Sequence, residues 1–167
     1  LPAVKTVHER LRVDFPMIAW GLQKELRLPK PMAVDVFASG LPEAYVAKDV
    51  SEGYEFVDPG KGKPIPVLVS KRLVAMANSA LAATLRIELT PKLISGLTYN
   101  VQLGRSFMTG SRKDPRARVV TCQVVGVSDR ATTLGFSVPA AVAARWNEEF
   151  GRPARPVETA WVELTEP

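Results

Sequence analysis

The sequence predicts an α+β fold, built from a mixed, mainly antiparallel sheet or sheets with a few packed helices. Segments that alternate apolar and polar residues with the period of a strand outnumber segments with helical spacing. Most strands that follow one another can pair in antiparallel fashion. The 167 residues, 46% of them apolar, are enough to bury the core of one domain, with a division into two subdomains left open.

The first part of the chain, residues 1–64, carries the weaker patterns. Residues 11–15 alternate apolar and charged side chains and predict a half-buried strand. Residues 17–28, followed by prolines, predict a short helix, and residues 32–38 predict a second strand. Residues 40–64 are rich in glycine, proline and charge, and they predict a loop.

Residues 65–167 predict a β-rich core with helices near residues 71–84 and 139–150. Residues 66–69 are a short apolar strand, and Ser70 directly after them is suited to be the N-cap of the first helix. Apolar residues then recur at helical spacing. This strand followed by a helix is among the clearest local signals in the chain.

The middle of the chain predicts a long hairpin. Residues 91–96 predict a turn or a single helical turn, and residues 97–103 alternate as a strand with one solvated face. Residues 119–127 are apolar on both faces and predict a central strand. We expect these two strands to pair across the polar connection of residues 104–118.

The end of the chain predicts a strand, a helix and a final strand. Residues 133–138 are a short strand, and Pro139 stands where the first helical residue is expected. Gly151 supplies the C-terminal stop of that helix. Residues 157–164 predict the last strand.

The charge pattern gives candidates for contact with a partner. The net charge of +5 is modest, and no aromatic residue interleaves with the basic cluster, so nucleic acid is not expected as a partner. We interpret the basic residues of the connection as a solvated hairpin tip; contact with anionic lipid headgroups or an acidic partner is the alternative. Trp20 is expected in the core, with an exposed apolar patch as the alternative. The candidate partner-contact residues are Arg112, Lys113, Arg116, Arg118 and Trp20.

The sequence offers no catalytic, cofactor-binding or metal-binding residue, and no cofactor is expected. His8, the one histidine, is expected to be an ordinary surface residue. Cys122, the one cysteine, can form neither an intramolecular disulfide nor a cysteine cluster for a metal, and we expect a small buried side chain. Residues 60–63 resemble a phosphate-binding loop only in composition and predict a solvated turn. Trp146 and Trp161 are expected in the core.

No stretch of the sequence is apolar for long enough to cross a bilayer. The chain begins with Leu1 rather than methionine and stops at Pro167, just after a predicted strand. We therefore expect an excised part of a longer protein.

Four motifs in order resemble one family. They are the segment PVLVSKRLV of residues 66–74, GLTYNV of 96–101, VVGV of 124–127 and FSVP of 136–139. Their order and rough spacing over residues 65–164 resemble the periplasmic core domain of MacB/LolC/FtsX-like ABC-transporter permeases. Each motif alone is weakly specific, and the ordered set is more so.

The resemblance implies a non-catalytic domain between the first and second membrane spans of a permease. The parent would lie in the inner membrane as a dimer, with residues 1–167 on the periplasmic side. An ATP-binding subunit would hydrolyse ATP, and the domain would transmit the resulting motion. Its partners would be a periplasmic adaptor, a lipoprotein or a cell-wall factor, or the membrane surface, bound through the loops at residues 40–64 and 104–118.

Two other functions stay open. The first is a freestanding periplasmic module that binds a ligand or a protein. The second is an enzyme with a dispersed active site, which requires a deep pocket holding perturbed carboxylates or His8.

Overall fold

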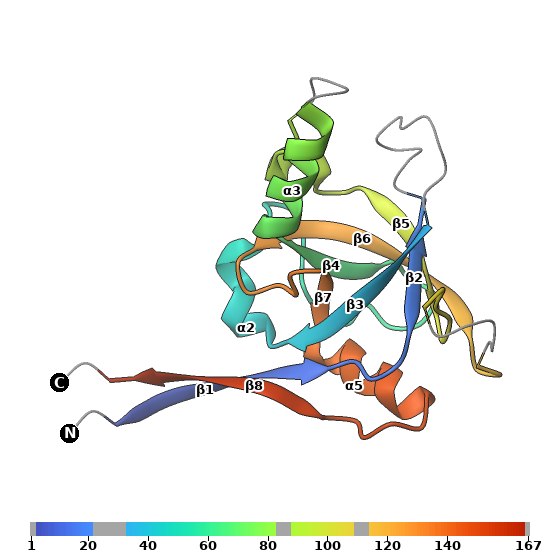
Figure 1. Cartoon of the computed structure of the whole chain (residues 1–167). Coiled ribbons are helices and arrows are strands. Elements are labelled where there is room, and N and C mark those ends of the chain that lie inside the picture. Colours follow the sequence, from blue (N-terminus) through green and yellow to red (C-terminus); the bar gives the residue numbers. More distant parts are fainter. Residues whose placement is uncertain (1–2, 22–32, 83–87, 109–113, 166–167) are drawn as a thin grey trace.

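The computed structural model describes residues 3–21, 33–82, 88–108 and 114–165. Their strands form one mixed sheet, six strands of which close into a ring, because β2 pairs with β3 as well as with β5 (Figure 1). The β3–β7 and β4–β6 pairs are parallel and the other pairs are antiparallel, so the predicted α+β class is confirmed. The ring runs β2 (Met17–Trp20), β5 (Thr98–Leu103), β6 (Arg118–Ser128), β4 (Ile65–Ser70), β7 (Gly135–Pro139) and β3 (Ala33–Leu41).

Two strands extend from the ring as a long arm (Figure 1). β1 (Val4–Arg12) pairs with β3 only at its end, through Leu11 and Arg12, and pairs with β8 (Val157–Leu164) along most of its length. The two ends of the described chain therefore meet at the tip of the arm, where the Thr165 N–H donates to the Ala3 carbonyl at 2.8 Å.

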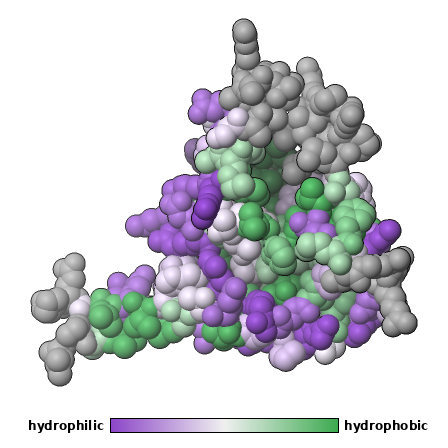
Figure 2. Space-filling model, viewed as in Figure 1, coloured by the Kyte–Doolittle hydropathy of each residue, from purple (hydrophilic) through white to green (hydrophobic). Residues whose placement is uncertain are grey.

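One face of the arm is apolar and exposed. The paired side chains Val4 and Leu164 are 62% and 54% exposed, and the next apolar pair, Val7 and Val162, is 52% exposed on both strands. Figure 2 shows these apolar residues gathered along the arm. The arm thus differs from the ring, whose inner face is closed to solvent.

Short helices cover the ring. α3 (Lys71–Ala82) begins as predicted, because the Ser70 hydroxyl accepts the Leu73 N–H at 3.1 Å. The predicted helical turn after residue 90 and the predicted helix after β7 are also present. The other helices of the described residues are α2 (Glu43–Val46), the 3₁₀ turn η1 (Ala47–Asp49), α4 (Pro91–Ile94) and α5 (Ala140–Glu149).

The core lies inside the ring and under α5. Trp146 and Val142 of α5 are fully buried, as expected for Trp146. Helix α5 lies close to β3 because Gly40 has no side chain: a Cβ there would stand 2.6 Å from the Cβ of Ala143. A smaller apolar cluster under α2 includes Val46 and Phe56.

The β5–β6 hairpin is confirmed. Its strands pair in antiparallel register from Thr98 with Gln123 to Leu103 with Arg118, and β5 alternates half-buried and buried residues as predicted. The loop prediction for residues 40–64 needs correction, because α2 and η1 lie within it. Pro139 ends β7 as the N-cap of α5, one residue earlier than expected, and Gly151 ends the helix with φ +66°.

The helix predicted over residues 17–28 is wrong at its start, because Met17–Trp20 is strand β2. Its neighbours β3 and β5 both pair with it and satisfy its backbone groups. This pairing joins residues far apart in the sequence, so local spacing does not reveal it. Residues 22–28 lie outside the described residues.

The strand predicted over residues 11–15 is displaced. β1 ends at Arg12, and the next residues leave the sheet under the control of Asn147, a fully buried residue of α5. The Asn147 amide accepts the Asp14 N–H at 3.2 Å and donates to the Arg12 carbonyl at 2.8 Å. This buried side chain fixes the point at which the chain passes from the arm into the ring.

Candidate functional site

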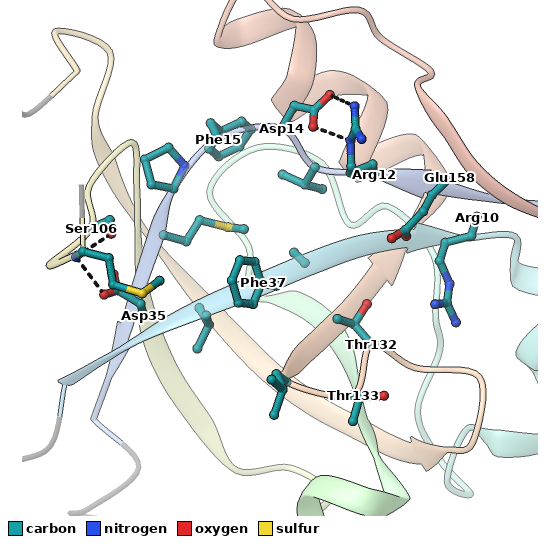
Figure 3. A pocket seen from close by; sticks show the side chains of 17 residues that line it. Arg10, Arg12, Asp14, Phe15, Asp35, Phe37, Ser106, Thr132, Thr133 and Glu158 are labelled. Atoms are coloured by element: carbon teal, nitrogen blue, oxygen red, sulfur yellow. Dashed lines mark hydrogen bonds and ion pairs between the residues drawn. The ribbon is translucent and has the colours of Figure 1, made fainter.

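A cleft of about 680 Å³ lies where the arm joins the ring (Figure 3). The arm contributes the ends of β1 and β8, and the ring contributes β3, the loop before β7 and the loop after β5. The cleft is thus the place where the two parts of the molecule share one surface.

The interior of the cleft is mainly apolar. Its floor is formed by the buried side chains of Phe15, Met17 and Ala38. Its walls carry Phe37, Leu134 and Met108, which are 55%, 57% and 70% exposed. Large side chains left this exposed beside a concave surface are typical of a binding site for an apolar group.

The rim of the cleft on the arm side is charged. Arg12 and Asp14 form a two-pronged ion pair, with Nε to Oδ1 at 2.5 Å and Nη2 to Oδ2 at 3.1 Å. The hydrogen bond to Asp14 and its charge raise the pKa of Arg12. Arg10 and Glu158 complete this side (Figure 3). The rim is therefore polar around an apolar floor, as in protein interfaces.

The opposite wall is held by Asp35. Its carboxylate accepts the N–H groups of Phe107, at 2.9 Å, and Met108, at 3.2 Å. The Ser106 hydroxyl also accepts the Met108 N–H at 2.9 Å. These bonds fix the backbone that presents the exposed Met108 side chain at the cleft.

The arm is held against the ring by stacked rings. Tyr45 of α2 stacks on His8 and on Trp161, with ring centroids 4.6 and 4.8 Å apart. The guanidinium of Arg130 lies 4.6 Å from the Tyr45 ring, and that of Arg10 lies 4.9 Å from Trp161. We call these five residues the arm clamp. Cation–π and stacked contacts of this kind each stabilise by about 0.5–1.5 kcal/mol.

His8 was expected at the surface, and this expectation is wrong: it is 8% exposed. The face of β1 that carries His8 turns toward α2, and its Nε2 lies 3.5 Å from the Glu163 carboxylate. Trp161, expected in the core, is only half-buried, because it packs on the outside of the small cluster under α2.

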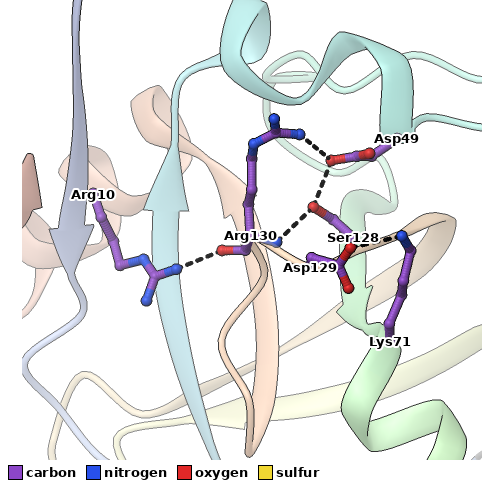
Figure 4. Close-up of polar contacts among 6 residues, drawn as sticks. All are labelled: Arg10, Asp49, Lys71, Ser128, Asp129 and Arg130. Atoms are coloured by element: carbon purple, nitrogen blue, oxygen red, sulfur yellow. Dashed lines mark hydrogen bonds and ion pairs between the residues drawn. The ribbon is translucent and has the colours of Figure 1, made fainter. Parts of the chain in front are cut away.

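Polar contacts anchor the clamp to the ring (Figure 4). Arg10 donates to the Arg130 carbonyl, and Arg130 Nη1 lies 3.1 Å from the Asp49 carboxylate. Asp49 also accepts the Ser128 hydroxyl at 2.6 Å. Hydrogen bonds to Tyr45 and Asp49 raise the pKa of Arg130. The arm is therefore connected to β6 and to η1 through fixed side chains.

The basic candidates from the sequence lie elsewhere. Arg116 is paired with Asp114 at 3.0 Å and faces the Phe150 ring, and Arg118 is paired with Glu149. Arg112 and Lys113 lie outside the described residues. Among the described candidates none lines the cleft.

Trp20, the remaining candidate, is half-buried at the end of β2, opposite Ala33 and Asn100. Sequence reasoning missed Phe37, Met108 and Leu134. The sequence held one signal for Phe37. It lies two residues after Asp35 in a predicted strand, so both side chains share one strand face, and a face that carries a charged residue is more often exposed than buried in a core.

The environment of Cys122 and the grouping of possible metal ligands bear on catalysis. Cys122 is fully buried, and burial raises the pKa of its thiol well above the ordinary value, which disfavours the reactive thiolate. Within the described ranges, no group of three or more His, Cys, Asp or Glu side chains could hold a metal ion. In the same part of the chain, no helix has both the length and the apolar character needed to cross a membrane.

Comparisons with known proteins show a likeness in structure but none in sequence. No protein-family model matches the sequence, and no curated protein sequence matches it. The structure is similar to the crystal structure of the extracellular domain of the noncanonic ABC-type transporter YknZ from Gram-positive bacteria, with 18% sequence identity and a TM-score of 0.46. The match covers 98% of this chain, which spans 66% of that domain.

Proposed function

We propose that residues 1–167 are a single non-catalytic extracytoplasmic domain of an ABC-transporter permease, which binds a partner and transmits motion driven by ATP hydrolysis elsewhere. The observation that carries the proposal is the arm. β1 and β8 run side by side and bring both ends of the described chain to one tip. A domain inserted between two successive membrane spans needs its two ends close together, and the pairing of β1 with β8 provides this. The ordered motifs over residues 65–164 support the same assignment.

The cleft supports the coupling of binding to motion. A bound group would contact Phe37 and Leu134 of the ring and Arg12 of the arm at once. The affinity for the bound group would then depend on the angle between the arm and the ring, so binding and the position of the arm would influence each other. We assign as occupant an apolar segment of a protein partner, because the cleft is open, its exposed methionine can adapt, and its rim is polar.

The first test is the hydropathy of the intact reading frame. The proposal expects one apolar span before Leu1, further spans after Pro167 and an ATPase gene or domain beside them. A reading frame without such spans would overturn the permease assignment. It would favour the freestanding periplasmic binding module, which the cleft also supports.

The second test measures the arm in the intact parent. Spin labels are placed at Val7→Cys on the arm and Leu93→Cys on the ring, both about half exposed, in a Cys122→Ser background. The distance between the labels should change between ATP-bound and nucleotide-free membranes. In a control pair on helices α3 and α4, Met76→Cys and Leu93→Cys, the distance between the labels should stay the same. Equal behaviour of the two pairs would contradict transmission through the arm.

A further inference from the structure

A second cleft, of about 540 Å³, is lined by described residues of the ring and of α5 and by none of the arm. It is formed by residues 60–65, the start of β6 and the second half of α5. Among the charged residues that the structure describes in its lining, four are basic and one, Glu149, is acidic. The basic residues are Lys61, Lys63, Arg118 and Arg145.

Ion pairs fix the two arginine side chains of the cleft. Asp58 accepts the Gly60 N–H at 2.9 Å and two bonds from Arg145, from Nη2 at 2.8 Å and Nε at 3.3 Å. Arg118 pairs with Glu149, which lies one helical turn after Arg145 on α5. Asp58 and Glu149 thereby fix both guanidinium groups, and they offset two of the four positive charges. Lys61 and Lys63 supply the surplus.

The loop leaves room for a ligand. Gly60 and Gly62 have φ of +81° and +79°, and no atom lies within 4 Å of where a Cβ would stand at either. The glycines alternate with Lys61 and Lys63, whose side chains are exposed. The sequence alone predicted a solvated turn here, and the fold places this turn against two arginines contributed by β6 and α5.

A buried donor in the same wall lacks an acceptor. Trp146 lines this cleft and is fully buried, and its indole Nε1 has no hydrogen-bond partner among the described residues. Buried N–H groups are nearly always paired, and leaving one unpaired costs free energy. This observation is independent of the surplus of positive charge.

We infer that this basic cleft binds an anion of the phosphate class, either a free phosphate ester or the phosphate of a lipid headgroup. The guanidinium groups and lysines supply charge-assisted donors for phosphate oxygens. The inference does not depend on the permease proposal, because it uses none of the residues of the arm or of the first cleft.

The test follows the indole N–H signals of the three tryptophans in the ¹⁵N-labelled chain during titration with inorganic phosphate at constant ionic strength. The Trp146 signal is assigned by elimination with Trp20→Phe and Trp161→Phe. We expect a saturable shift of this signal. The double variant Lys61→Gln/Lys63→Gln should bind phosphate at least about fivefold more weakly, because it removes the unpaired charges.

The matched control is Lys48→Gln/Lys92→Gln, which removes two exposed lysines outside the cleft. Its affinity for phosphate should stay unchanged. No saturable shift of the Trp146 signal, or an equal loss in the control, would overturn the inference. Flotation with phosphatidylglycerol vesicles distinguishes a lipid headgroup from a free phosphate ester. Vesicle binding that is lost in Lys61→Gln/Lys63→Gln would assign a lipid headgroup. Phosphate binding without vesicle binding would assign a free ester.

Discussion

The ring and the arm belong to the same hydrogen-bonded sheet, yet their strands are covered differently. Each ring strand has a neighbour on both sides, and the ring interior holds the large buried side chains. β8 in the arm has one neighbour, and most of its residues are exposed. The ring therefore resists local opening, whereas the position of the arm depends on a few side chains at its root.

Because of this difference, the ring should determine the stability of the domain, and the arm clamp should determine the position of the arm. A substitution in the ring should unfold the whole domain, because its core is shared by every strand. A substitution in the arm clamp should release the arm and leave the ring folded. Variants in the two regions can therefore show whether the arm is a separate cooperative unit.

The largest effect is expected from Gly135→Ala in the ring. A Cβ at Gly135 would stand 1.9 Å from the Phe37 carbonyl oxygen, so β3 and β7 must separate where they pair. We expect a loss of about 3 kcal/mol in the free energy of unfolding, measured by urea denaturation. Gly60→Ala is the control, with open space around the new Cβ and a cost of only about 1 kcal/mol from its positive φ. Equal losses would show that the β3–β7 approach does not limit stability.

An intermediate effect is expected from Tyr45→Ala in the arm clamp. The variant removes the stacking on His8 and Trp161 and the contact with Arg130, so the arm should open about 2 kcal/mol more easily. Hydrogen exchange of β1 and β8 amides reports this opening, and exchange in β4 and β6 should stay slow. Tyr45→Phe keeps the ring contacts and should retain most of the protection. Faster exchange throughout the ring would mean that arm and ring form one cooperative unit.

A smaller effect on stability is expected in the first cleft, where the two regions meet. Phe37→Ser should change the free energy of unfolding by less than about 1 kcal/mol, because the side chain is 55% exposed. It should weaken binding of an apolar fluorescent dye about fivefold by removing apolar contact area. Leu93→Ser removes an equally exposed side chain outside the cleft and should leave dye binding unchanged. Undiminished binding by the Phe37 variant would place the dye elsewhere.

Local features of the fold could be predicted from the sequence, and features made by closure of the ring could not. The alternation of residues 97–103 and the cap at Ser70 depend on near neighbours, and both were predicted. Strand β2 depends on pairing with β3 and β5, which are distant in the sequence, so four residues with a helical composition were assigned to the wrong element.

The same reason explains the sites. Phe37, Met108 and Leu134 come from three separate segments, and only the folded chain brings them to one cleft. His8 is buried because α2 covers that face of β1, and nothing in the sequence near His8 signals this. Arg116 and Arg118 are the described basic residues of the hairpin connection, and their pairing with Asp114 and Glu149 required the structure.

The smallest effect on stability is expected from two ion pairs, one next to the ring and one on the arm, compared at two pH values. In the ring body, Asp114 accepts the backbone N–H and the side chain of Arg116, and these bonds lower the pKa of the Asp114 carboxyl. A carboxyl whose folded pKa is lowered stabilises the fold above its unfolded pKa, near 3.8, and this contribution disappears as pH falls through the folded value.

Asp114→Asn should therefore lower the denaturation midpoint slightly at neutral pH and leave it unchanged well below pH 3.8. On the arm, Lys5→Gln breaks an exposed ion pair with Glu163 at 3.9 Å and should have no measurable effect at either pH, because solvent screens such pairs. A pH-independent loss in the Asp114 variant would mean that the connection is held by shape rather than by charge. An effect of Lys5→Gln equal to that of Asp114→Asn would mean that the tip of the arm contributes to global stability, so the arm could not move as a separate unit.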